Sequence, residues 1–199
     1  MRVRNWIQTV PTLVIIGTVL FAVLTAGSGL LLWGSNFAHN MVHNQLTEQK
    51  IQFPPKGSPG LDPKEFPGLQ RYAGQAVNNG PKAKAYADQF IAVHLKGIAG
   101  GKTYSEVSAA SLADPKNTKL AGQVQTLFRG ETLRGLLLYA WGWSVVAEIA
   151  LWVGYAAIVA AAAVLLALIA GFLAHERATK HAAATAPTSP LVREPVTVG

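Results

Sequence analysis

The chain has 199 residues, of which 50% are apolar and only 14% are charged, and it contains no cysteine. The lack of cysteine excludes a disulfide framework, a thiolate metal site and a cysteine nucleophile. The low charge content and a mean hydropathy of +0.27 exclude a typical soluble cytosolic enzyme. The formal net charge of +7 is spread along the chain, which indicates solvation and attraction to anionic lipid rather than a nucleic-acid site.

The first apolar block covers residues 10–33 and contains no charged residue. As a helix it would extend about 36 Å, enough to cross a hydrocarbon core of about 30 Å. Arg2 and Arg4 before it also fit a cleaved signal peptide, but the apolar run exceeds the usual signal core of about 7–15 residues. We therefore predict a retained transmembrane helix at residues 10–33, preceded by a cytoplasmic N-terminus at residues 1–9.

The second apolar block covers residues 136–174 and contains one charged residue, Glu148. A helix of that length would extend about 58 Å, which is too long for one crossing. We expect residues 151–174 to form the second transmembrane helix and residues 136–150 to continue as helix outside the membrane. An aromatic belt at residues 139–143 instead would place Glu148 within lipid, at a cost of several kcal/mol.

Basic residues flank the two predicted spans on the same side, where they are Arg2, Arg4, Arg177 and Lys180. The positive-inside rule then predicts a multi-pass protein of the plasma membrane with both termini in the cytoplasm. Residues 34–135 form an extracytoplasmic region in this topology. Residues 175–199 form a cytoplasmic tail that is rich in alanine, threonine and proline, and we expect it to be disordered.

The extracytoplasmic region is expected to be a small helical cap. Residues 52–68 hold five prolines and three glycines, which favours an extended strap rather than a core element. Residues 81–99 and 117–135 are predicted helices, and Tyr86 and Phe90 lie on the apolar stripe of the first. The predicted fold class is therefore mostly α: a two-transmembrane-helix hairpin with long helices extending outward and a small extracytoplasmic cap.

Residues 86–143 carry the order YA…H…GGKTY…DP…R before the second span. This part resembles a family of small actinobacterial two-span membrane proteins, often labelled "aromatic ring-opening dioxygenase", and the matching positions are Tyr86, Ala87, His94, Gly100, Gly101, Lys102, Thr103, Tyr104, Asp114, Pro115 and Arg134. The resemblance implies the two-span topology but no established activity. Ring opening on non-haem iron needs two histidines and a carboxylate around open coordination positions, and the sequence shows no such triad with an obvious pocket.

Three histidines are candidate metal ligands. His39 and His43 lie four residues apart on one face of a predicted helix, and with His94 they could bind zinc, copper or haem iron. The alternative without a metal is that they are polar residues facing water or lipid headgroups. We favour this alternative and assign no metal or cofactor.

Glu148 is the one acid in the second apolar block. It is either a proton or ion relay, or the partner of a buried arginine from another chain, or an interfacial carboxylate paired with Arg134 or a nearby cation. We favour the interfacial carboxylate. Within the cap, we expect Tyr86, Phe90 and Arg134 to organise the fold.

Small residues form a stripe along each predicted span, and such stripes let helix backbones approach closely in lipid. They are Thr18, Ala22, Thr25 and Gly29 on the first span, and Ala156, Ala160, Ala163, Ala167 and Gly171 on the second. Either the two spans of the chain pack on each other through these stripes, or the stripes dock against neighbouring proteins. In both cases the expected helix-packing residues are Gly29, Ala156, Ala160 and Ala163.

The sequence predicts a non-enzymatic accessory or assembly subunit of a larger integral membrane complex. The first complex to consider is an actinobacterial respiratory supercomplex of cytochrome bc and cytochrome oxidase, because some small two-span proteins of this general kind sit beside respiratory complexes. One alternative is a metal- or haem-associated redox protein that uses histidines at the outer membrane surface. Another is a stand-alone lipid-binding envelope protein. The sequence indicates no nucleic acid, cofactor or small-molecule substrate.

Overall fold

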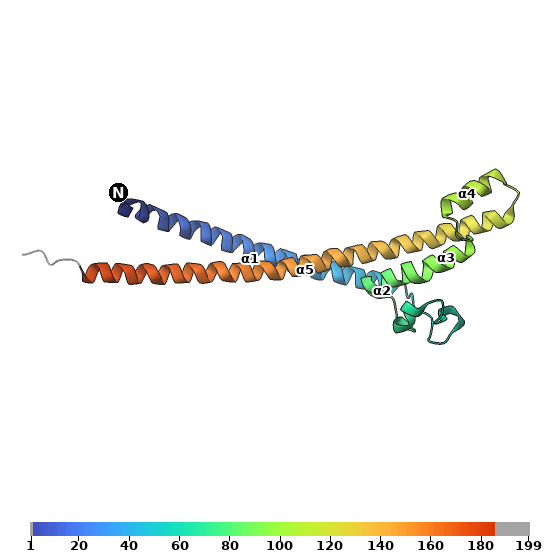
Figure 1. Cartoon of the computed structure of the whole chain (residues 1–199), viewed down its shortest axis with the longest axis horizontal. Coiled ribbons are helices and arrows are strands. Elements are labelled where there is room, and N and C mark those ends of the chain that lie inside the picture. Colours follow the sequence, from blue (N-terminus) through green and yellow to red (C-terminus); the bar gives the residue numbers. More distant parts are fainter. Residues whose placement is uncertain (1, 186–199) are drawn as a thin grey trace, which may run out of the picture. The chain divides into compact units, whose positions relative to one another are not determined.

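The computed structural model describes residues 2–185, with side chains described for residues 12–181 and 184–185. Its elements are helical: α1 (Arg2–Glu48), η1 (Pro59–Leu61), η2 (Pro67–Tyr72), α2 (Gly80–Ala85), the π-helix η3 (Tyr86–Ile91), α3 (Ala92–Ile98), α4 (Tyr104–Ala113) and α5 (Thr118–Ala184) (Figure 1). The chain divides into two compact units. The terminal unit comprises Met1–Ser28 and Ala156–Gly199, and the central unit comprises Gly29–Tyr155.

Helices α1 and α5 are long and apolar enough to cross a membrane, with candidate spans at Thr12–Glu48 and Thr118–His181. Most of their large apolar side chains are exposed, whereas the core helix of a soluble protein would bury them. The hydroxyls of Thr18 and Thr25 donate to backbone carbonyls four residues earlier, at 2.8 Å. These polar side chains are therefore satisfied inside their own helix, as lipid requires.

In the terminal unit, the two helices touch along a line of small and apolar residues. A Cβ at Gly17 would come within 2.7 Å of Leu168 Cδ2. Ser28 and Ala161 are buried, with exposed fractions of 4% and 6%. The close approach at Gly17 depends on its missing side chain.

Helix α5 continues to Ala184, so the prediction of a disordered tail is wrong for residues 175–184. This stretch contains no glycine or proline and is rich in alanine and charged helix formers. Glu176 and Lys180 form an i,i+4 ion pair with an N–O distance of 4.0 Å, which adds modest support. The rest of the predicted tail, residues 186–199, lies outside the described residues.

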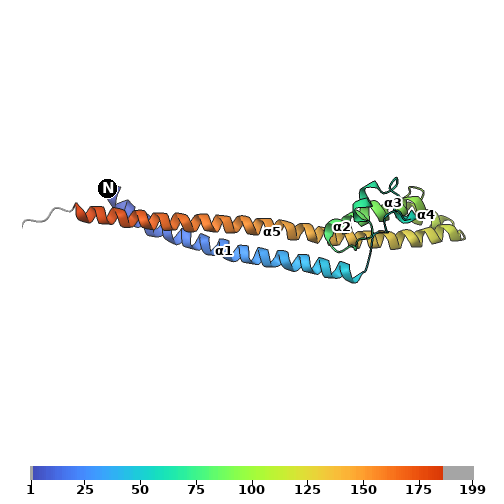
Figure 2. The same cartoon turned by 90° about the horizontal axis from the view of Figure 1, so that it is seen from below.

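In the central unit, α2, η3 and α3 form one helical run that lies alongside α5 in both views (Figure 1; Figure 2). The run is antiparallel to α5: Gly80 contacts Ser144 and Gly130 contacts Leu95. The side chain of Gln123 donates to the carbonyl of Ile98 at 2.8 Å. The predicted helices at residues 81–99 and 117–135 therefore exist, and the second runs into the long apolar helix without a loop.

The proline-rich residues 52–68 contribute to the core, so the prediction that they form a strap outside it is wrong. Phe53, Leu61 and Phe66 have exposed fractions of 1%, 0% and 3%. The backbone of Phe53 donates to Gln75 at 2.9 Å, which fixes the base of the loop. Prolines impose turns on this segment, and the turns bring the apolar residues between them to one side, where they are buried.

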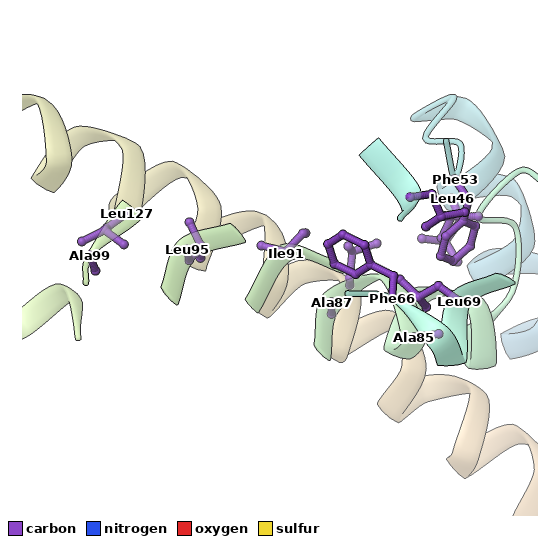
Figure 3. Close-up of a cluster of buried hydrophobic side chains, with 14 of the residues drawn as sticks. Leu46, Phe53, Phe66, Leu69, Ala85, Ala87, Ile91, Leu95, Ala99 and Leu127 are labelled. Carbon is purple, nitrogen blue, oxygen red and sulfur yellow. The ribbon is translucent and has the colours of Figure 1, made fainter. Parts of the chain in front are cut away.

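The helical run from α2 to α3 has two faces. Its aliphatic face points at α5 and includes Ala87, Ile91, Leu95 and Ala99, which follow one another along α5, with Leu127 of α5 beside Ala99 (Figure 3). Its aromatic face carries Tyr86 and Phe90, which are only half-buried. The buried stripe thus has a spacing of four residues, which fits a run that includes the wide turn of a π-helix.

Candidate functional site

A cavity of about 590 Å³ lies in the central unit between α1, α5 and the start of α2. We call it the polar cavity. Its polar lining residues include His39, His43, Asn78, Ser144 and Glu148. Its size is within the usual range of small-ligand sites, which is about 300–1,000 Å³.

The polar cavity brings His39 and Glu148 together, although they are far apart in sequence. His39 Nε2 lies 3.8 Å from Glu148 Oε2, and the indole N–H of Trp152 donates to Glu148 Oε1 at 2.9 Å. On the other side of the imidazole ring, His39 Nδ1 lies 3.1 Å from the carbonyl oxygen of Ser35. Glu148 is therefore paired with a histidine and an indole. Arg134, which we expected as its partner, instead contacts Asp88 and Glu131.

The three candidate histidines do not form one site. His43 lines the polar cavity and its Nδ1 lies 3.0 Å from the carbonyl oxygen of Asn78. His94 instead stacks on Phe66, with ring centroids 5.4 Å apart and an interplanar angle of 10°. Across the described part of the chain, no group of three histidine, aspartate or glutamate side chains is placed to hold a metal. His39 and His43 thus line the polar cavity, whereas His94 lies outside it.

A second hollow, the apolar groove, lies between α1 and α5 in the central unit and has a volume of about 480 Å³. Beside it runs a line of exposed apolar side chains on α5, which we call the exposed stripe: Leu136, Tyr139, Trp143, Val146 and Ile149. Tyr139, Trp143 and Val146 belong to both features. The spacing of three and four residues places the whole stripe on one helix face.

The small-residue stripes predicted for helix packing are exposed. A β-carbon at Gly29 would meet no neighbouring group within 4 Å, and Ala156, Ala160 and Ala163 are all exposed. Within the terminal unit the contact instead uses Gly17, Ser28, Ala161 and Leu168. The interpretation in which the two stripes pack on each other therefore does not hold.

The residues expected to organise the cap lie where the helical run meets α5 and the proline-rich loop. The ring centroid of Tyr86 is 5.1 Å from that of Phe53, and Phe90 is 5.6 Å from Phe66. Arg134 contacts Asp88 at 3.4 Å and Glu131 at 3.3 Å. These aromatic and ionic contacts hold the segment between α1 and α5 in place.

Asp88 is a site residue that the sequence reasoning missed. The hydrogen bond from Lys84 lowers the pKa of the Asp88 carboxyl; desolvation opposes this, and the Arg134 guanidinium lowers the pKa further. Lys84 also lies over the ring of Trp141, 4.6 Å from its centroid. The i,i+4 spacing of Lys84 and Asp88 was a visible signal, but the contacts with α5 were not.

Comparisons with protein-family models, with curated proteins and with solved structures found no match for this chain. Its function must therefore be inferred from the two hollows of the central unit and from the exposed apolar surface of the long helices.

Proposed function

We propose that the chain is a non-enzymatic accessory or assembly subunit of a larger integral membrane complex. In this proposal α1 and α5 each cross the membrane once, and the exposed stripe and the apolar groove dock against a neighbouring protein. Both termini lie in the cytoplasm and the segment between the two helices forms an extracytoplasmic cap. The chain acts by covering and positioning a partner, without chemistry of its own.

The observation that carries the proposal is the length of exposed apolar surface on α5. Large exposed apolar side chains extend from Leu136 to Leu173 along one continuous helix, a rise of about 57 Å. A bilayer core is about 30 Å thick. Even at a tilt of about 40°, at the upper end of the usual range, the run would still project about 44 Å along the membrane normal.

The part of the apolar surface of α5 that extends beyond the bilayer core must therefore be buried by something other than lipid acyl chains. If residues 151–174 occupy the bilayer, the exposed stripe lies outside it. A contiguous exposed apolar surface of this kind marks a protein contact. The exposed small-residue stripes within the proposed spans add a surface on which a neighbouring helix packs closely in lipid.

Respiratory complexes of the plasma membrane are the first partners to test, because the sequence resembles small actinobacterial two-span proteins. We would express a tagged full-length chain in its native membrane, solubilise gently and identify comigrating proteins on a native gel by mass spectrometry. We expect migration with a complex of several hundred kilodaltons. A small species without partners would contradict the proposal.

Two leucine variants locate the contact. Leu136→Arg places a charge on the exposed stripe, where the leucine is 63% exposed, and it should release the chain from the complex. Leu112→Arg is the matched control, because Leu112 is a 79% exposed leucine on α4, away from the stripe. We expect the control to comigrate as the wild type does. Equal behaviour of the two variants would place the contact elsewhere.

A further inference from the structure

We infer that the apolar groove receives one transmembrane helix of a different protein, and that this helix continues outward beyond the bilayer with an uncharged apolar face. The inference rests on the proposed accessory role and specifies the chemistry of the partner. Three observations carry it: the spacing of the residues on the two walls of the groove, the level of the groove in the proposed topology, and the charge of the segment between α1 and α5.

Both walls of the groove repeat with the period of a coiled-coil seam. The α5 wall is formed by Tyr139, Trp143, Val146 and Ala150, and the α1 wall by Leu30, Gly34, Phe37 and Met41. In each wall the residues follow one another at spacings of four, three and four. Apolar residues that alternate in this way hold the side chains of a neighbouring helix in a left-handed bundle. The occupant that matches both walls is therefore an α-helix lying along α1 and α5.

The floor of the groove is made of small residues. Ala38 on α1 and Ala147 on α5 line it and are buried, with exposed fractions of 6% and 1%. Phe37 and Val146, the wall residues that directly precede them, are exposed. The exposed walls thus begin beside the place where α1 and α5 already meet, and the small floor leaves room for the large side chains of a third helix.

The lining sets the chemistry of the helix face that enters. The described residues that line the groove include no charged side chain. A charged group buried against them would lose its hydration without gaining a partner, so the entering face is uncharged. Phe37, Tyr139 and Trp143 supply large aromatic rings, the side chains that are enriched at the centres of protein interfaces.

The level of the groove in the proposed topology favours protein over lipid as its occupant. A Cβ at Gly154 would come within 3.0 Å of Leu32 Cδ2, so the outer ends of the two proposed spans, residues 10–33 and 151–174, lie at about the same level. From Ala150 to Tyr139 the groove extends about 17 Å along α5 beyond this level. The headgroup layer of one leaflet is only about 5–8 Å thick. Acyl chains therefore do not reach the outer part of the groove, whereas a transmembrane helix that continues outward does.

Charge favours a different protein over a second copy of this chain. Residues 34–135 contain twelve lysine and arginine residues and seven aspartate and glutamate residues, a net charge of +5. Two copies inserted in the same orientation would bring two such segments together on one side of the membrane, and like charges oppose association. A partner whose outer segment is acidic is attracted instead.

The test places the photocrosslinking amino acid benzoylphenylalanine at single positions of the tagged full-length chain in its native membrane. Val146 and Val145 are a matched pair, because they are adjacent exposed valines that line the apolar groove and the polar cavity respectively. Val146→benzoylphenylalanine should form an adduct with one partner protein, and Val145→benzoylphenylalanine should form none with it. Both variants are first checked for comigration with the complex, which shows that they are folded and assembled.

The attachment points on the partner report whether a helix fills the groove. Mass spectrometry of the adducts from positions 139 and 146 should place them about seven residues apart on one apolar helix. The outer segment that follows this helix should carry a net negative charge. Attachment points scattered over several segments of the partner, or equal adducts from positions 145 and 146, would overturn the inference.

The same experiment separates failure of the inference from failure of the accessory role. Comigration with a large complex, together with lipid adducts alone from position 146, would overturn the inference and leave the accessory role standing. An adduct of twice the mass of the chain, without comigration, would overturn both, because the groove would then hold a second copy.

Discussion

Gly80 and Ser144 lie in such close contact that no side chain fits at position 80. A Cβ there would overlap the Ser144 side chain and come within 3.3 Å of the Trp141 backbone. We predict that Gly80→Ala separates α2 from α5 and destabilises the central unit by about 1–3 kcal/mol. Thermal unfolding in detergent, followed by circular dichroism, measures this loss.

Gly135→Ala is the matched control on α5, because no atom lies within 4 Å of a Cβ at that position. A helical glycine costs about 0.5–1 kcal/mol relative to alanine, so this variant should be as stable as the wild type or slightly more so. Adding Ser144→Gly to Gly80→Ala should recover part of the lost stability. An equally destabilised Gly135→Ala would contradict the proposed close approach.

Asp88→Asn should make the stability of the central unit less dependent on pH. Lys84 and Arg134 lower the pKa of the folded carboxyl, so ionised Asp88 stabilises the fold at neutral pH. This stabilisation disappears as the pH falls through the lowered pKa, below about pH 4. Unfolding by denaturant from pH 3 to pH 7 should therefore show a wild-type advantage at pH 7 that shrinks on acidification.

The control for Asp88 is Glu131→Gln. Glu131 contacts the same arginine, but its side chain is 44% exposed, and exposed ion pairs contribute at most about 1 kcal/mol. The variant should follow the wild-type pH profile closely. A constant difference between wild type and Asp88→Asn at every pH would show that the charge of Asp88 is not what stabilises the contact.

Phe53→Ala should strongly destabilise the loop between α1 and α2. Phe53 is 1% exposed, and its ring centroid lies 5.2 Å from Tyr72 and 5.1 Å from Tyr86. Truncation of a buried phenylalanine costs about 3–5 kcal/mol. Limited proteolysis should detect faster cleavage within residues 52–78. Phe128→Ala is the control, since Phe128 is 54% exposed on α5, and it should be cleaved at the wild-type rate.

The orientation of the chain is testable with a protease site inserted after Gly57, which is exposed in a turn with φ +77°. In the proposed topology this site faces the outside, so protease added to intact cells should cleave it. The same site placed after Thr185 should be cleaved only when the cells are opened. Protection of the first site in intact cells would mean that the topology is inverted or that a partner covers the loop, and opened cells with the complex dissociated distinguish the two.

The helices could be predicted because local rules determine them. Long uncharged runs specify α1 and α5 within their apolar blocks. Burial in the loop could not be predicted in this way. Whether Phe53 and Phe66 are buried depends on turns that bring distant residues together, and the high proline content obscures this.

The polar cavity could not be predicted from the sequence, because it forms only where α1 and α5 pack together. His39 and Glu148 meet only because α1 and α5 are antiparallel in a particular register, and the sequence leaves that register open. The helix contact also differs from the prediction. Counting small residues identified Ala156 and Ala160, but these are exposed, whereas Ala161 in the same stretch of the terminal unit is buried.

The π-helix η3 gives the run from α2 to α3 a point at which its length can change. A π turn holds one more residue than an α turn, with the N–H of Ala92 bonded to the carbonyl of Ala87. Removing one residue between Tyr86 and Ile91 would convert the wide turn into an ordinary one and leave the flanking helices in phase with α5. The same deletion in α5 would rotate every later side chain by about 100°. Single-residue length variation among natural relatives should therefore concentrate in η3.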